Sequence, residues 1–287
     1  MGSYEAVLPA LSSAIASGAA AILLKHSTKG IKPILVNYIK AASGSLALGL
    51  TVVIFAWNEL ISISFSDFII VAFVGLTGPF IAWFLFIKAL SIGDVSLVHP
   101  IVNTYSLSAM LFSFILLKSS VKIEHIIGAL LVVIGIRLLA EKGRKGKILV
   151  PMLLALAVSL IWGLNTVLFK ITLARSGPLV LSFLRVLFAF IFMTPIALRY
   201  LVNSKANIEL KYIGSASLAG LISDFIGVFL WLLSLKLGEV SVAATISASS
   251  PIFSAIFSLK IFGEKISERR FLGIFLSVAG ICIVSAT

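Results

Sequence analysis

The stretch Gly93-Asp94-Val95-Ser96 returns 145 residues further on as Gly238-Glu239-Val240-Ser241, and the whole chain aligns with itself at this offset. Outward from these two stretches, identical residues pair at the same spacing: Leu8 with Leu153, Gly18 with Gly163, Lys25 with Lys170, Pro33 with Pro178, Gly75 with Gly220, Gly128 with Gly273 and Gly135 with Gly280. Each half contains five apolar segments, so the second copy would enter a membrane in the direction opposite to the first. The sequence therefore predicts an inverted repeat, which is typical of secondary transporters with a site between their two halves.

The composition indicates an integral membrane protein. Hydrophobic residues make up 60% of the chain and charged residues 12%, against roughly 45–50% and about 25% in soluble domains. A membrane-spanning helix needs about 20 mainly apolar residues. Ten such stretches lie near residues 6–25, 33–56, 68–90, 93–117, 123–141, 148–170, 178–200, 212–235, 239–262 and 269–286. We predict an all-α protein with ten transmembrane helices, in which residues 1–141 form one five-helix repeat, 142–147 a basic connector and 148–287 the second five-helix repeat.

The net charge of +12 follows membrane topology and does not suggest nucleic-acid binding. Lys and Arg residues lie at span ends and in short loops instead of gathering on one solvated face. Sixteen of them fall on one side of the predicted membrane and five on the other. Because positively charged loops stay in the cytoplasm, this multi-pass protein of the cell membrane is expected to have both termini outside. One cysteine, Cys282, and three histidines suggest neither a disulfide nor a Cys/His zinc site, and no cofactor is expected.

Several residues of the second half stand in a characteristic order: Trp162-Gly163, Lys170, Pro178, Arg185, Gly238-Glu239-Val240-Ser241, Pro251, Gly263-Glu264-Lys265, Gly273 and Gly280. This order resembles the EamA-type repeat of the drug/metabolite transporter superfamily. The first half resembles it less closely, with Ser17-Gly18 in place of Trp-Gly and Lys118-Ser119-Ser120 in place of Gly-Glu-Lys. The resemblance implies a carrier of small metabolites, often an exporter of amino acids or related compounds. It also implies that both termini lie inside the cell, and against this we retain the orientation that the charges predict.

Asp224 is the first candidate for a functional residue, because it lies about midway along the eighth predicted span. A carboxylate at that depth costs at least about 2.5–3.5 kcal/mol on insertion scales, so it should face a partner or water. Such a group suits the coupling of transport to a proton or a cation. The alternative is a structural acid that is hydrogen-bonded to a neighbouring helix. The equivalent residue of the first half is Pro79, so either role would belong to one half only.

The fourth and ninth predicted spans carry polar residues next to proline. His99 and Asn103 are four residues apart and share a helix face, and His99 could bind substrate or relay a proton. Pro100 between them breaks the helix, and broken helices at membrane depth tend to line a cavity. Ser249 could line a polar pocket and Pro251 could act as a second hinge. For all five residues the alternative is a polar kink or close packing between helices.

Lys40 and Arg185 occupy equivalent positions, about 10 Å into their spans at 1.5 Å per residue. Each could extend to the membrane surface, hold a carboxylate or phosphate of a substrate, or pair with Asp224. Trp162, with Asn165 three positions on, could form a wall for an aromatic or amphipathic solute. For Trp162 and Asn165, the alternative is packing in the core.

These features favour a secondary carrier that exports small metabolites by alternating access, with protons or exchange as the driving force and Asp224 or His99 as the coupling group. A lipid-carrier flippase on the same scaffold is the main alternative. We do not expect an enzyme, because no nucleophile motif is present, and the sequence contains no ATP-binding loop of the Gly-x-x-x-x-Gly-Lys-Ser/Thr type. The expected partners are a small-molecule substrate, protons and membrane lipids, and the protein is a monomer or a homodimer.

Overall fold

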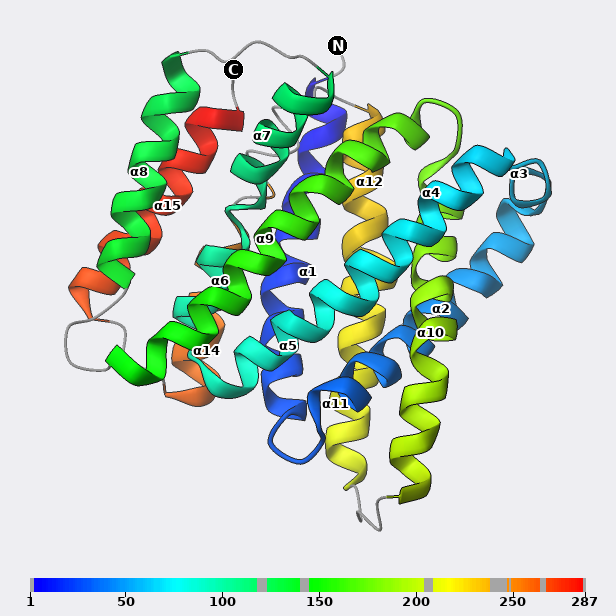
Figure 1. Ribbon diagram of the computed structural model, residues 1–287, viewed down its shortest axis with the longest axis horizontal. Coiled ribbons are helices and arrows are strands. Elements are labelled where there is room, and N and C mark those ends of the chain that lie inside the picture. The colour runs from blue at the N-terminus through cyan, green and yellow to red at the C-terminus, as the bar shows by residue number, and fades with distance from the viewer. Residues whose placement is uncertain are drawn as a thin grey trace.

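The structure is a computed structural model, and it describes residues 3–117, 123–139, 145–203, 209–237, 247, 249–263 and 267–285. These residues form a bundle of helices, and no strand occurs among them (Figure 1). The first half contains α1 (Ser3–Ser27), α2 (Pro33–Phe55), α3 (Trp57–Ile61), α4 (Phe65–Gly75), the π-helix η1 (Leu76–Ala82), α5 (Trp83–Ile92), α6 (Val95–Val102), α7 (Tyr105–Leu117) and α8 (Ile123–Leu139). The second half contains α9 (Lys145–Leu173), α10 (Pro178–Asn203), α11 (Leu210–Gly220), the π-helix η2 (Leu221–Gly227), α12 (Val228–Leu237), α14 (Ser250–Phe262) and α15 (Glu268–Ser285).

Seven segments of the described chain are long and apolar enough to cross a membrane. They are Glu5–Ser27, Pro33–Phe55, Phe65–Ile92, Val95–Leu116, Ile148–Leu173, Pro178–Val202 and Leu210–Leu237. The other three predicted spans contain the helices α8, α14 and α15, which are shorter or, in α15, begin with three charged residues. Seven of the ten predicted spans therefore meet the criteria of length and composition within the described residues.

Several residues singled out in the sequence lie outside the described part of the chain. They include Lys118-Ser119-Ser120, residues 142–144 of the expected connector, Gly238-Glu239-Val240-Ser241 and Glu264-Lys265. The rest of the expected connector is helical, because α9 begins at Lys145.

The 145-residue offset is reproduced in the secondary structure. The series α4, η1 and α5 has the same bounds as α11, η2 and α12 when 145 is added to each residue number. Both copies thus contain a π-helix of seven residues at the same place, and π-helical turns are rare and frequent at functional sites. The helices α2 and α10 both begin at the paired prolines Pro33 and Pro178, since proline is well suited to the first turn of a helix.

Paired glycines mark equivalent contacts between the two halves. A Cβ atom on Gly220 would collide with the carbonyl oxygen of Lys40, and a Cβ atom on Gly75 would collide with that of Arg185, which is the residue equivalent to Lys40. Three such pairs have mirrored contacts in the other half: Gly220 with Gly75, Gly18 with Gly163, and Gly135 with Gly280. At these positions glycine therefore allows close contact between helices.

The bundle has a middle and an edge. The helices α8 and α15 lie side by side at one edge of the bundle, whereas α1 and α9 run through its middle (Figure 1). The fourth predicted span is divided at Asn103 and Thr104, between α6 and α7. The break follows Pro100, which lies inside α6, by three residues.

Candidate functional site

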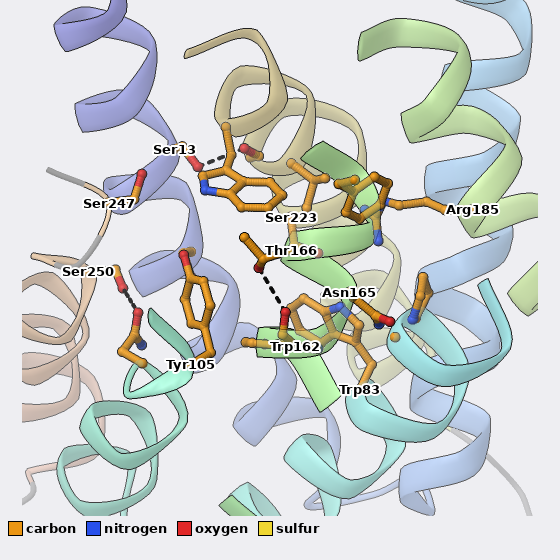
Figure 2. Close-up of a pocket in the computed structure, with 18 of the residues that line it drawn as sticks. Ser13, Trp83, Tyr105, Trp162, Asn165, Thr166, Arg185, Ser223, Ser247 and Ser250 are labelled. Carbon is orange, nitrogen blue, oxygen red and sulfur yellow. Dashed lines mark hydrogen bonds between the residues drawn. The ribbon is translucent and has the colours of Figure 1, made fainter. Parts of the chain in front are cut away.

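A cavity of about 130 Å³ lies between the two halves, near the middle of the bundle. Five aromatic side chains line it: Trp83, Tyr105, Trp162, Phe169 and Trp231. Its polar wall includes Ser13, Ser17, Asn103, Asn165, Thr166, Arg185, Ser223, Ser247 and Ser250. In Figure 2, Arg185, Asn165 and Trp83 lie on one side of the cavity, and Ser247 and Ser250 lie on the opposite side. The volume holds roughly ten water-sized positions, so the cavity suits a small organic solute.

Asp224 lies next to this cavity in a buried ionic cluster. Its Oδ2 atom accepts a hydrogen bond from Nζ of Lys40 at 2.5 Å, and its Oδ1 atom accepts one from Nη2 of Arg185 at 3.0 Å. The exposed fractions of Asp224, Lys40 and Arg185 are 0%, 0% and 3%. The three residues come from η2, α2 and α10, so the cluster joins the two halves. Lys40 and Arg185 therefore take the third of their expected roles, pairing with Asp224.

Lys40 does not extend to the membrane surface. Its Nζ atom lies 3.8 Å from the centroid of the Trp83 ring, which is within the range of a cation–π interaction. Trp83 also lines the cavity, so its ring stands between Lys40 and the cavity space. Trp83 is one of the tryptophans that the sequence places inside a span, away from the membrane interfaces where Trp is enriched, and this position was its only signal.

Arg185 belongs to both the cluster and the cavity wall. Its Nη2 atom donates to Asp224, but its buried Nε atom has no hydrogen-bond partner among the described residues. The same holds for Nδ2 of Asn165 and Oγ of Ser247, which also line the cavity. Buried polar groups are normally paired, and three exceptions around one cavity indicate a place for a polar ligand.

Trp162 and Asn165 both line the cavity from α9. The ring centroid of Trp162 lies 5.3 Å from that of Trp83 and 6.1 Å from that of Tyr105, so these three rings of the aromatic wall form one connected cluster. Asn165 Oδ1 accepts a hydrogen bond from Oγ1 of Thr77, at 2.9 Å.

His99 lies behind the cavity wall and links α6 to α14. Its Nδ1 atom is 2.7 Å from Oγ of Ser254, and its carbonyl oxygen accepts a hydrogen bond from Nδ2 of Asn103 at 2.8 Å. Oγ of Ser250 in turn donates to Oδ1 of Asn103 at 2.9 Å. Asn103 and Ser250 line the cavity, whereas His99 does not. Ser249 is the N-terminal cap residue of α14 and is half-buried.

Pro251 lies in the first turn of α14, where a missing backbone N–H is tolerated. The structure thus places Pro251 at the start of a helix. Residues 238–246 and 248, which precede this helix, lie outside the described chain, and the expected hinge at Pro251 stays a prediction.

The sequence analysis missed Asn37. Its Nδ2 atom donates to the carbonyl oxygens of Pro79 and Phe80 in η1, at 2.9 and 3.1 Å. Pro79 is the residue equivalent to Asp224, so α2 holds the same turn of both π-helices, through Asn37 in one half and Lys40 in the other. An amide near the start of an apolar span, three residues before Lys40, was the signal that could have pointed to it.

Apolar helices long enough to cross a bilayer, built as a duplicated unit around a cavity with aromatic and polar walls, define a multi-pass membrane protein of the transporter class. The chain belongs to the EamA-like transporter family, whose model matches residues 5–140 and again 149–286. The chain is also similar to an uncharacterized transporter of Archaeoglobus fulgidus, with 22% identity over 199 residues, or 69% of each chain. A crystal structure of another protein, 19% identical, superimposes with a TM-score of 0.70 over 97% of this chain and 95% of the other, which shows a common fold.

Proposed function

We propose that this protein is a secondary carrier that exports small metabolites, amino acids or related organic compounds, by alternating access. The observation that carries the proposal is the cavity between the halves, lined by five aromatic rings and by three buried polar groups without a partner among the described residues. A transporter of this kind places its substrate near the middle of the membrane, where its two repeats meet.

The proposed architecture is ten spans in two inverted five-helix repeats. The mirrored glycine contacts support equivalent packing of the two halves. In Figure 1, α1 starts at the upper edge of the bundle, where the N-terminus is marked, whereas α9 starts at the lower edge. Opposite directions of these two equivalent helices are what an inverted repeat requires. The helices α8, α14 and α15 would belong to the remaining spans.

Ion pairs close to the ends of the helices are candidates for contacts that break and form during transport. At one end Arg270 Nη1 pairs with Asp94 Oδ2 at 3.0 Å, and Lys25 Nζ donates to the carbonyl oxygen of Gly93 at 3.2 Å. At the other end Arg175 Nη2 pairs with Asp67 Oδ1 at 2.5 Å. The hydrogen bond and the charge of Asp67 raise the pKa of Arg175, so this arginine stays charged.

Coupling to protons or to exchange is proposed to involve Asp224. A proton on Asp224 would remove the charge that holds both Lys40 and Arg185, and would thereby loosen α2 from η2 and α10 from η2. One titratable group thus connects the packing of the two halves. His99 is a weaker candidate for coupling, because it lies behind the cavity wall.

The test is transport into proteoliposomes with the purified protein. Counterflow of a panel of radiolabelled amino acids and organic acids is measured with and without a pH gradient, for the wild type and Asp224→Asn. Gradient-driven uptake lost in Asp224→Asn, with counterflow retained, supports Asp224 as the coupling carboxylate. Unchanged transport in the variant would refute that role. Absence of transport of every solute would contradict the carrier and favour the flippase.

The proposed orientation, with both termini outside, has a separate test. Exposed loop residues at the two ends of the bundle, Lys29 and Ser62, are changed to cysteine in a Cys282→Ala background and treated in intact cells with a membrane-impermeant thiol reagent. Labelling of Ser62→Cys and protection of Lys29→Cys are expected. The reverse pattern would place both termini inside.

The enzyme alternative gains no support from the site. His99 and Ser254 are close enough to resemble a Ser–His pair, at 2.7 Å. However, both are buried and neither lines the cavity, so a substrate in the cavity would not reach the serine hydroxyl. Among the described residues no group of His, Cys, Asp or Glu is arranged to hold a metal ion.

A further inference from the structure

We infer that the cavity selects small organic monoanions over zwitterions and cations, and that Arg185 and Asn165 bind the anionic group. This inference rests on the proposed carrier function and narrows its substrates to organic anions, so that zwitterionic amino acids are no longer among them.

The first observation is the charge of the buried cluster. Lys40 and Arg185 carry two positive charges, and Asp224 supplies one negative charge, which leaves a net charge of +1. No Asp or Glu side chain occurs in the cavity wall formed by the described residues. A buried charge without a counter-charge is strongly unfavourable. A ligand with a single negative charge, bound at the cavity wall beside Arg185, would balance the cluster.

The second observation is the pattern of unpaired hydrogen-bond donors. Arg185 Nε and Asn165 Nδ2 are both donors, both are buried, and neither meets an acceptor among the described residues. The two residues lie against the same stretch of chain, since a Cβ atom added to Gly75 would meet the carbonyl oxygen of Arg185 and one added to Gly78 would meet Nδ2 of Asn165. A carboxylate is an acceptor with two oxygens, so one such group could satisfy both donors.

The third observation is what the rest of the wall offers. Beyond Arg185 and Asn165 the described cavity wall consists of aromatic rings, hydroxyl groups, the amide of Asn103 and small apolar residues. An apolar body would pack on the rings of Trp83 and Trp162. The ammonium group of an amino acid would find no carboxylate there and would lie close to a cluster that is already positive. Like charges at such a site disfavour the wrong ligand.

The experiment uses three ligands with similar branched carbon chains and different charges. They are 4-methylpentanoate (a monoanion), leucine (a zwitterion) and 3-methylbutylamine (a cation). Binding to the purified protein in detergent is measured by tryptophan fluorescence, because three of the four tryptophans line the cavity. We expect 4-methylpentanoate to bind at least about tenfold more tightly than either of the others, which is the scale of one charge-assisted hydrogen bond.

Three variants connect the preference to Arg185. Arg185→Gln leaves the neutral pair of Lys40 and Asp224, removes the net charge and is expected to abolish the preference for the anion. Arg185→Lys keeps the charge and should keep the preference with weaker binding. Arg199→Gln is the matched control, since Arg199 lies on the same helix, α10, is exposed and lies outside the cavity wall; it should bind all three ligands like the wild type.

The outcomes separate this inference from the proposed function. Preference for the anion, lost only in Arg185→Gln, supports the inference. Equal or tighter binding of leucine overturns it but leaves a carrier of zwitterions. Anion preference that survives Arg185→Gln also overturns it, because Arg185 would then not bind the anionic group. Failure of all three ligands to bind also overturns it. The carrier function itself fails only if the proteoliposome panel shows no transport of any solute.

Discussion

Replacement of Asp224 by asparagine tests whether this carboxylate holds the centre of the protein together. Asparagine has nearly the same shape but no charge. In Asp224→Asn the buried cluster changes from a net charge of +1 to +2, and Lys40 and Arg185 face each other across a neutral amide. The variant therefore isolates the electrostatic role of Asp224 from its packing.

The magnitude follows from the two contacts that are lost. Removal of one partner from a buried ion pair typically destabilises a protein by about 3–5 kcal/mol. Asp224 is the partner in two pairs, at 2.5 and 3.0 Å, and all three residues are inaccessible to solvent. We expect the free energy of unfolding of Asp224→Asn to fall by about 5 kcal/mol, at the upper end of that range.

A second substitution distinguishes the loss of charge pairing from a simple loss of packing, because the two explanations predict opposite changes in stability. Arg185→Gln alone keeps the pair of Lys40 and Asp224 and removes an uncompensated charge, so it should cost only about 1 kcal/mol. In the double variant of Asp224→Asn and Arg185→Gln, a single unpaired cation remains instead of two. The double variant should therefore be more stable than Asp224→Asn, by about 1–2 kcal/mol.

The assay is equilibrium unfolding of the purified variants in mixed micelles of detergent and SDS, followed by far-UV circular dichroism. Reaction of the single cysteine, Cys282, with a thiol-reactive dye gives an independent probe of unfolding. Asp67→Asn is the matched control: its partner Arg175 has a side chain 52% exposed and can be solvated, so the cost should stay near 1 kcal/mol. A stability of Asp224→Asn within about 0.5 kcal/mol of the wild type, or a double variant less stable than Asp224→Asn, would refute the reasoning.

Two further predictions concern the contacts between helices. Gly220→Ala places a methyl group against the carbonyl oxygen of Lys40 and should lower the yield of folded protein, whereas Gly214→Ala in the same helix has no atom within 4 Å of its new Cβ and should fold like the wild type; size-exclusion chromatography of the two variants decides this. Asn37→Ala leaves the buried carbonyl oxygen of Pro79 without its donor and should lower the free energy of unfolding by about 1–3 kcal/mol, as measured in the same SDS titration.

The sequence predicted the duplicated architecture because packing constrains particular positions. Gly75 and Gly220 recur at the repeat spacing since a side chain at either position would meet the backbone of the opposite half. Such steric constraints appear directly in the residue type. The shorter helices α8 and α15 were predicted from hydropathy as well, although their length or charge keeps them below the criteria for a membrane span.

The sequence left the ionic cluster as one of three alternatives for Lys40 and Arg185. Whether a lysine about 10 Å into a span reaches the surface or turns inward depends on the rotation of its helix relative to helices of the other half. The π-helix η2, which carries Asp224, contains an additional residue in its turn and so changes the direction in which Asp224 faces α2. Apolar residues such as Leu221 and Ile222 give no signal of this π-helix in the sequence. The same reason explains why Asn37 was missed: its partners are backbone carbonyls of η1, which have no sequence signature.

The functional centre arises where the duplication is broken. Lys40 and Arg185 are equivalent, and each is located where α2 or α10 meets a π-helix of the duplicated third segment. Only one of the two π-helices has an acid at the equivalent position, because Pro79 stands where the other half has Asp224. Two equivalent cations with one acid cannot be neutral. The duplication brings the charges together, and the difference between Pro79 and Asp224 leaves the excess of +1 beside the cavity. Substitution of Pro79 by an acid would compensate that charge, and a protein so changed should lose its need for an anionic ligand.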